Sequence, residues 1–209
     1  MKINYQIEME RELARIQADG RRPRLLLHSC CAPCSSFVLE RLMNVFDLTV
    51  FYYNPNIAPR EEFLRRVEEQ QRLIDAMPHE RPIDLIQGEY DDRAFYELAR
   101  GHEQDPEGGE RCTACFRLRL GKTAEVAAQG GFDYFTTTLS ISPLKDAQRL
   151  NAIGAVLSAE TGVPYLFSDF KKRNGYKRSC ELSAQYGLYR QDYCGCIYSR
   201  MERDRRQEK

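Results

Sequence analysis

Seven of the eight cysteines in this 209-residue chain fall into three short groups. The groups are Cys30, Cys31 and Cys34; Cys112 and Cys115; and Cys194 and Cys196. A secreted disulfide framework would spread its cysteines along the chain, whereas clustered cysteines in a reducing compartment are typical of metal ligands or catalytic thiols. The grouping therefore predicts a metal centre, a reactive thiol, or both.

The first group, in "LLLHSCCAPCSS", directly follows a short apolar run. Side chains alternate along a strand, so Cys30 and Cys31 can converge on one object only if the chain turns there. Pro33 can begin a helix and provide that turn, and helix N-terminal N–H groups stabilise thiolates. We expect Cys30 and Cys31 to face one centre. Cys34 could complete a C-x2-C pair with Cys31 or bind a second metal.

The second group, in "RCTACF", places Cys112 and Cys115 at positions i and i+3, which share one face of a helix. Together with Cys30 and Cys31 they offer four thiolates, a set that suits tetrahedral zinc or an iron–sulfur cluster.

The third group is the Cys194–Gly195–Cys196 sequence in "YCGCIY". Cysteines two residues apart can reach disulfide distance, and Gly195 tolerates the strained backbone of so small a ring. Strained disulfides are easily reduced and tend to be regulatory or catalytic. We predict a redox-active pair, with two further metal ligands as the alternative. The lone Cys180 is expected to be an inert thiol.

Basic residues gather near the C-terminus, and tyrosines interleave with them. The cations are Lys171, Lys172, Arg173, Lys177, Arg178 and Arg190. Against two carboxylates in residues 169–190, these six cations give a local charge of +4. Cations for phosphates and aromatic rings for stacking suit single-stranded nucleic acid, and a solvated basic face is the alternative.

The whole chain, in contrast, has no net charge, is 42% hydrophobic and 30% charged. This composition fits one soluble globular domain, so any nucleic-acid contact must be local. No apolar run approaches the roughly 20 residues of a membrane span. The charged N-terminus lacks the apolar core of a secretory signal. We therefore expect a cytoplasmic protein with no membrane partner.

Strands that alternate with helices must position these groups. Short apolar or aromatic runs predict five strands, at 24–28, 48–53, 83–87, 132–137 and 163–167. Helices are predicted at 34–43, 59–76, 93–100, 112–130 and 145–162, with Asp92 able to cap the third. The pattern predicts an α/β fold with a parallel sheet of about five strands. Ligands bind such sheets at the carboxyl ends of the strands, where the first cysteine group would lie.

We expect three segments along the chain. Residues 1–20 would form an amphipathic extension, residues 21–199 the α/β catalytic domain, and residues 200–209 a charged tail that frays.

Several motifs in order give the chain its resemblance to a known family. They are "HSCCAPC", "PNIAPREEFLRR", "RCTACFRLRL", "TTLSISPLKD", "DFKKRNGYKRS" and "LYRQDYCGCIYS". Over about residues 25–199 the chain resembles the QueH family of epoxyqueuosine reductases. The resemblance implies reduction of epoxyqueuosine to queuosine at the wobble position of tRNA, the final step of queuosine synthesis. It also implies a [4Fe-4S] cluster, no cobalamin, an electron donor, and a fold similar to the adenine-nucleotide α-hydrolase-like (HUP) layer.

On this reading we assign the cluster to Cys30, Cys31, Cys112 and Cys115, with Cys34 free for a second, mononuclear metal ion. The rival ligand assignment uses Cys34 in place of Cys30 or Cys31. Cys194 and Cys196 would supply electrons, and an acid must protonate the departing oxygen. Candidate acids are Asp91, Asp169, Tyr90 and His28. Asp169 could instead help Cys194 and Cys196 bind the second metal.

Two other functions compete with the reductase. The first is a sulfur-inserting tRNA-modifying enzyme on the same fold. The loop of residues 29–34 contains no glycine, which argues against the close phosphate approach that ATP chemistry needs. The second is a zinc-stabilised tRNA-binding module without catalysis.

Overall fold

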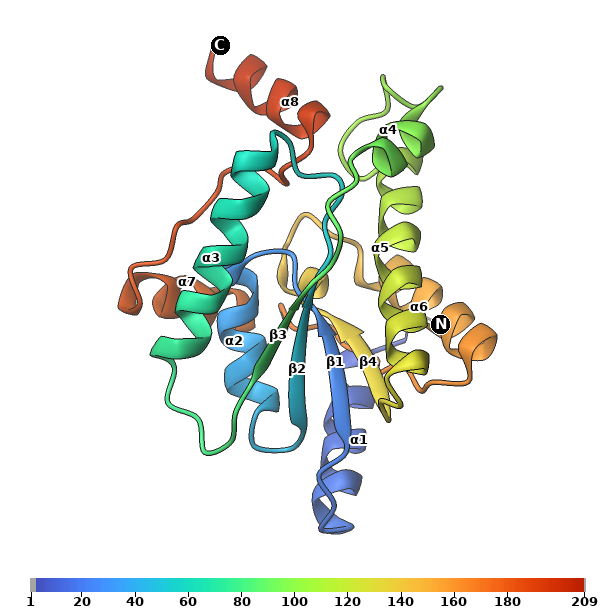
Figure 1. The fold of residues 1–209 in the computed structure, drawn as a ribbon, viewed down its shortest axis with the longest axis vertical. Helices are drawn as coiled ribbons and strands as arrows, with labels where there is room; N and C mark the ends of the chain where they lie inside the picture. The colour runs from blue at the N-terminus through green and yellow to red at the C-terminus, as the bar shows by residue number, and fades with distance from the viewer. Residues whose placement is uncertain (1–2, 209) are drawn as a thin grey trace.

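The computed structural model describes residues 3–208 as an α/β body built on one parallel sheet. Residues 1, 2 and 209, which belong to the predicted extension and tail, lie outside the described residues. The strands are β1 (Arg24–His28), β2 (Asp47–Tyr52), β3 (Asp84–Gln87) and β4 (Tyr134–Thr137), in the order β3-β2-β1-β4. Every neighbouring pair is parallel, so the predicted architecture is confirmed (Figure 1).

The fifth predicted strand, at residues 163–167, is wrong as a strand and contributes one parallel bridge between Phe135 and Tyr165. Its Pro164 accepts a hydrogen bond from Phe135 N but has no N–H to donate. The carbonyl of Leu166 binds the side chain of Thr136 at 2.8 Å and does not extend the backbone ladder. The segment therefore lies along the edge of a four-stranded sheet.

Helices cover both faces of the sheet (Figure 1). On one side lie α2 (Ala32–Leu42), α3 (Arg60–Ala76) and α7 (Gly175–Gln185); on the other lie α5 (Glu110–Gln129) and α6 (Ala147–Thr161). The short helices α4 (Arg93–Ala99) and η1 (Thr138–Ile141) lie toward the carboxyl ends of the strands. The predicted helices agree with α2 to α6 to within three residues, whereas α7 was not predicted. Asp92 precedes α4 without a side-chain cap.

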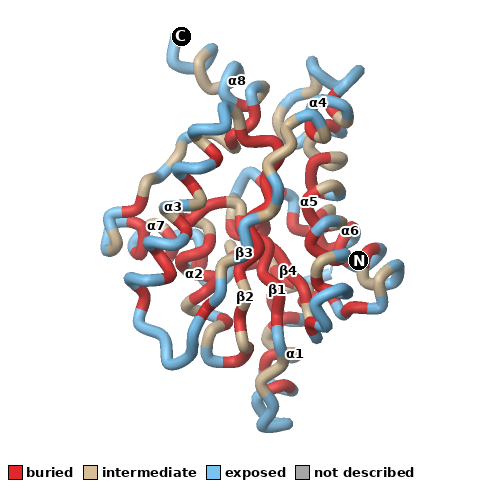
Figure 2. The backbone as a smooth tube through the Cα atoms, in the orientation of Figure 1, coloured by how far each residue is buried: buried red, intermediate tan, exposed pale blue. Residues whose placement is uncertain are grey.

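The core has two main clusters, one on each face of the sheet, because strand side chains alternate between faces. Leu25 and Leu27 pack into the cluster on the α2 side, while Leu26 between them packs into the cluster on the α5 and α6 side. Figure 2 shows β1, β2 and β4 as buried over most of their length, whereas the edge strand β3 is largely exposed. This rigid sheet fixes the loops at its carboxyl ends, where the functional groups lie.

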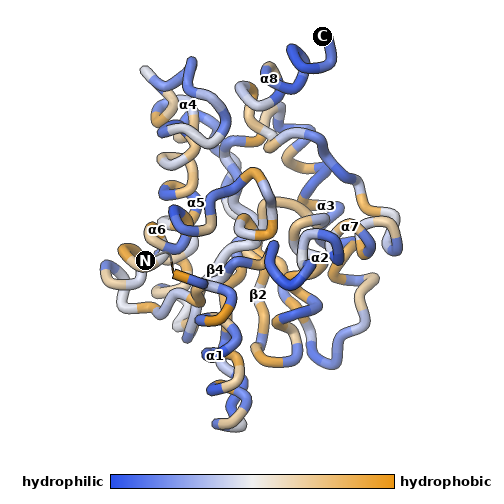
Figure 3. The backbone as a smooth tube through the Cα atoms, turned by 180° about the vertical axis from the view of Figure 1, so that it is seen from behind, coloured by the Kyte–Doolittle hydropathy of each residue, from blue (hydrophilic) through white to orange (hydrophobic). Residues whose placement is uncertain are grey.

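Both ends of the chain are helical. In α1 (Tyr5–Ala18), Met9, Leu13 and Ile16 join the core cluster on the α2 side, so the amphipathic extension is packed against the sheet. The charged tail predicted at residues 200–209 is helical as far as Gln207, within α8 (Ile197–Gln207). The helix is strongly hydrophilic (Figure 3), and its Arg203 forms ion pairs at 2.7 Å with Asp192 and Asp204.

Among the helices that the structure describes, none is both long and apolar enough to cross a membrane.

Candidate active site

The first cysteine group forms a compact triad, which we define as Cys30, Cys31 and Cys34. Their three sulfur atoms lie within 4.8 Å of one another, and the Sγ atoms of Cys30 and Cys31 are 3.9 Å apart. The triad lies where β1 ends and α2 begins, with Cys31 at the N-cap and a proline in the first turn. The predicted turn therefore brings the thiols together. It also joins Cys34 to the other two, as the rival ligand assignment requires.

The triad is arranged to carry negative charge. Thr138 accepts a hydrogen bond from the Cys30 N–H and donates its hydroxyl to Cys30 Sγ at 3.4 Å. Hydrogen bonding from Cys31 and Cys34, with the Thr138 contact, holds the pKa of the Cys30 thiol well below its ordinary value. Hydrogen bonding with Cys30 and Cys31 raises the pKa of the Cys34 thiol. This geometry favours a thiolate on Cys30 that accepts hydrogen bonds from the protonated thiols of Cys31 and Cys34.

The other two cysteine groups meet in one cavity, which we call the thiol cavity. It is lined by Asn56, Phe95, Glu107, Arg111, Cys112, Cys115, Phe116, Arg119, Cys194, Cys196 and Ser199. Helix α5 supplies Cys112 and Cys115 one turn apart, and the segment before α8 supplies Cys194 and Cys196. All eight cysteines are free thiols in this structure, and burial raises the pKa of Cys115 to about 12.

A segment without regular structure, residues 186–196, carries Cys194 and Cys196 to the cavity. We call it the C-terminal strap. Helix α3 holds it: Arg72 donates to the carbonyl oxygens of Tyr186 and Gly187 at 2.9 and 3.0 Å, and Glu69 accepts the N–H of Tyr189 at 2.6 Å. Side chains of α3 thus hold the first residues of the strap in place.

At its end the strap turns sharply over α3. Arg66 donates to the carbonyl oxygen of Cys194 at 3.3 Å, and the N–H of Ala58 donates to that of Gly195 at 3.1 Å. Gly195 has φ 115°, and an added Cβ would lie 2.9 Å from both Arg66 Nη1 and Ile57 Cγ1. Only glycine fits this turn.

Arg111 also lines the thiol cavity and binds the loop before α5. Its buried Nη1 donates to the carbonyl oxygens of His102, Glu103 and Asp105 at 2.6–3.0 Å. Its Nη2 lies 3.6 Å from Glu202 on α8. Arg111 therefore ties the loop before α5 to α8.

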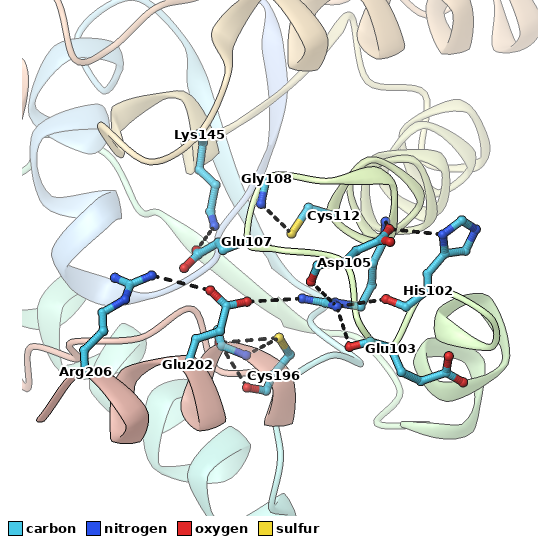
Figure 4. A network of polar contacts seen from close by, with 12 residues as sticks. His102, Glu103, Asp105, Glu107, Gly108, Cys112, Lys145, Cys196, Glu202 and Arg206 are labelled. Atoms are coloured by element: carbon cyan, nitrogen blue, oxygen red, sulfur yellow. Dashed lines mark hydrogen bonds and ion pairs between the residues drawn. The ribbon is translucent and has the colours of Figure 1, made fainter. Parts of the chain in front are cut away.

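Glu107, in the same loop, forms an ion pair with Lys145 at 2.7 Å (Figure 4). Lys145 is 7% exposed. Although burial opposes its charge, nearby Cys194 and Glu107 raise the pKa of Lys145. The charges of Glu107 and Lys145 thus neutralise each other where Glu107 lines the thiol cavity.

The charge of Arg119 acts on cysteines of both the triad and the thiol cavity. Its buried guanidinium donates to Asn54 at 2.9 Å, and it lies among Cys115, Cys194, Cys30 and Cys112. Burial opposes the charge, yet these thiols raise the pKa of Arg119. We did not predict from the sequence that cations would surround the thiols; these cations are Arg66, Arg111, Arg119 and Lys145. Arg119 follows Cys115 by four positions on one helix face, a signal that could have revealed it.

The structure does not bring Cys30, Cys31, Cys112 and Cys115 together as a single compact set. Among residues 3–208, the triad is the one group of three or more potential ligands whose donor atoms all lie within 4.8 Å. Cys112 and Cys115 share their cavity with Cys194 and Cys196. The assignment of four cluster ligands therefore stays a prediction.

The residues nevertheless fit an anionic iron–sulfur cluster. Such clusters need cysteine thiolates, which the triad and the thiol cavity supply. Thiolates and bound sulfides bring negative charge, which needs compensation in a buried site. Arg66 and Arg119 provide it, since Cys31 lies near the first and Cys30 near the second.

Of the four candidate acids, His28 is excluded by its environment. It is fully buried, its Nε2–H donates to the carbonyl oxygen of Tyr53 at 3.1 Å, and Nδ1 accepts from the Thr137 hydroxyl at 2.8 Å. Burial, with the charge of Arg119, lowers the pKa of His28 to about 3. The imidazole is therefore neutral and joins β1 to its neighbours.

The other three candidate acids have partners of their own. The Tyr90 hydroxyl donates to the carbonyl oxygen of Ile57 at 3.0 Å, and Asp91 pairs with Arg93 at 2.9 Å. The Asp169 carboxylate pairs with Lys171 at 2.8 Å. None of the three lines the thiol cavity.

The basic segment, residues 171–190, is more neutralised than its sequence indicates. Arg173 pairs with Glu10 of α1 and Arg178 with Glu40 of α2, at 3.2 and 2.6 Å. Among the described residues, the exposed cations of this segment without an ion pair are Lys172, Lys177 and Arg190. The partner carboxylates come from distant helices, so local sequence could not reveal them.

Comparison with known proteins identifies the family. The family model described as "Epoxyqueuosine reductase QueH" matches residues 25–202. A relative of that name from Staphylococcus epidermidis is 41% identical, over 96% of this chain and 86% of its own. Relatives of the same name from Streptococcus pyogenes and Thermotoga maritima are 41% and 34% identical, covering 95% and 86% of this chain and 78% and 91% of their own.

Proposed function

Because the chain belongs to the QueH family of epoxyqueuosine reductases, we propose that it reduces epoxyqueuosine to queuosine at the wobble position of tRNA. The structural observation that carries the proposal is the meeting of Cys112, Cys115, Cys194 and Cys196 in one cavity beside the Cys30 triad. Seven thiols among buried arginines suit electron transfer. Substrate tRNA is cytoplasmic, so we expect the protein to act there.

The overall reaction needs two electrons and two protons, because removing an epoxide oxygen as water leaves an alkene. Cys194 and Cys196 can supply both as they form a disulfide: epoxide plus two thiols gives alkene, water and one disulfide. An external electron donor must then return the pair to dithiol. Gly195 and the bond from Arg66 support this role, since they fix the backbone between the two sulfurs.

We propose that Cys30, Cys31, Cys112 and Cys115 hold a [4Fe-4S] cluster, with Cys34 as the rival for one position in the set. Bound there, the cluster would supply single-electron transfer. Arg66 and Arg119 would offset its charge and exclude bulk water from the thiols. The basic segment would bind the anticodon stem-loop through Lys172, Lys177 and Arg190, whose charges are free for phosphates.

Anaerobic purification tests the proposal. We expect a brown protein with broad visible absorption that contains iron and sulfide. With a reductant it should convert epoxyqueuosine to queuosine in tRNA, as measured by nucleoside mass spectrometry. Cys180→Ser is the matched control and should behave like wild type, since Cys180 belongs neither to the triad nor to the thiol cavity. A colourless zinc protein that binds tRNA without converting it would refute the reductase. Consumption of ATP would point to sulfur insertion.

A further inference from the structure

Two asparagines in the loop after β2 have opposite environments. Asn54 is fully engaged: its amide donates to the carbonyl oxygen of Ser29 at 2.8 Å and accepts from Arg119 at 2.9 Å. Asn56, two residues later, is 1% exposed and lines the thiol cavity. Neither its Oδ1 nor its Nδ2 has a hydrogen-bond partner among the described residues.

Arg119, which Asn54 holds in place, also lines the thiol cavity and is 1% exposed. Its Nε and Nη2 have no hydrogen-bond partner among residues 3–208. Buried polar groups are nearly always satisfied, because an unpaired one costs about 1–3 kcal/mol. Asn56 and Arg119 line the same cavity, with the Nε of Arg111 as a further unpaired donor there, and together they indicate a polar ligand that supplies the missing partners.

We propose that Asn56 and Arg119 bind the epoxide oxygen of the substrate and stabilise the negative charge that develops on it as its bonds to carbon break. The inference rests on the proposed function. An epoxide oxygen can only accept hydrogen bonds, and these residues offer the unpaired donors Nδ2, Nε and Nη2. Buried donors held in place by the surrounding protein need no reorganisation during the reaction.

The chemistry balances with the groups that line the cavity. As each carbon–oxygen bond breaks, its electron pair moves onto the oxygen that Asn56 and Arg119 hold. Cys194 and Cys196 give up two electrons and two protons and form a disulfide. The protons convert the oxygen to water, and the two carbons become doubly bonded. No oxidant is needed, and the electron donor enters only to reduce the disulfide.

The test uses Asn56→Leu, which keeps the shape of the side chain and removes its hydrogen bonds. We expect kcat for epoxyqueuosine-containing tRNA to fall about 10²-fold, as for loss of one such donor elsewhere. The melting temperature should equal or exceed that of wild type, because no bond within the protein is lost. Visible absorption, iron content and KM for tRNA should not change.

Asn151→Leu is the matched control. Asn151 is also buried, but its amide donates to the carbonyl oxygens of Ala147 and Ser168 and accepts the backbone N–H of Ser168. This variant should lower the melting temperature and leave kcat of the folded protein unchanged. An unchanged kcat in Asn56→Leu would overturn the inference. So would a change in its absorption or iron content, which would assign Asn56 to the cofactor. Arg119→Lys, a second variant, should lower kcat with the charge retained. Absence of turnover in wild type would instead refute the proposed function.

Discussion

Arg66 of α3 donates a hydrogen bond of 3.3 Å to the carbonyl oxygen of Cys194, 128 positions later in the chain. The same guanidinium pairs with Glu62 at 2.7 Å, and nearby Cys31 contributes to raising its pKa. Arg66 therefore stands between the triad and the Cys194–Gly195–Cys196 turn. The buried Arg66 guanidinium therefore connects the triad with the Cys194–Gly195–Cys196 turn, although the two lie far apart in the sequence.

Gly195→Ala should destabilise the protein and misplace Cys196. The new Cβ would approach Arg66 Nη1 and Ile57 Cγ1 to 2.9 Å, at a φ that L-residues rarely adopt. We expect a loss of about 1–3 kcal/mol in the free energy of unfolding, measured by urea denaturation. Alkylation of Cys196, which is buried in the native turn, should become faster. Unchanged stability together with an unchanged alkylation rate would show that the turn does not need glycine.

Serine variants separate the two ligand assignments. If Cys30, Cys31, Cys112 and Cys115 bind the cluster, Cys112→Ser should lose most of its iron and visible absorbance, while Cys34→Ser retains both. Iron content and absorption spectra after anaerobic reconstitution are the measurements. The opposite outcome, with a full cluster in Cys112→Ser and none in Cys34→Ser, would place Cys34 in the ligand set.

Charge removal in the basic segment should affect tRNA binding unevenly. Lys172→Ala removes a cation without an ion pair, whereas Arg173 is already paired with Glu10. If Lys172 contacts a phosphate of the loop, its loss should weaken binding and reduce the slope of log Kd against log salt by about 0.7. Arg173→Ala should change the slope less. Arg81→Ala, at the amino end of the sheet beside Asp47, serves as a control. Equal slopes for all three variants would exclude the basic segment as a tRNA-binding surface.

Protonation of His28 should destabilise the fold in acid. Its pKa is lowered to about 3 by burial, below the value of about 6.5 in the unfolded chain. The unfolded state therefore binds more protons between these values, and stability should fall by about 1.4 kcal/mol per pH unit as pH decreases from about 6.5 toward 3. Urea denaturation of wild type and His28→Gln measures the difference, and the variant should lack this contribution. Equal pH slopes would show that His28 titrates normally in the folded protein.

The sequence was a good guide where local pattern decides the structure. Short apolar or aromatic runs located the four strands, and the C-x2-C spacing placed Cys112 and Cys115 one turn apart on α5. It failed at Pro164, where a missing N–H limits a predicted strand to one bridge, and it did not predict the helix α8 over Ile197–Gln207. The grouping of Cys112 and Cys115 with Cys194 and Cys196 depends on the strap along α3, a long-range arrangement that no local pattern encodes.

One single-turnover measurement tests the central claim most directly. Cluster-loaded protein, with all thiols reduced and excess reductant removed anaerobically, is mixed with an excess of tRNA that contains epoxyqueuosine. Mass spectrometry then quantifies queuosine in the tRNA and disulfide in the protein. We predict one queuosine per chain, formed together with a disulfide between Cys194 and Cys196. If the loaded protein binds the tRNA and forms no queuosine, this chain is not the reductase.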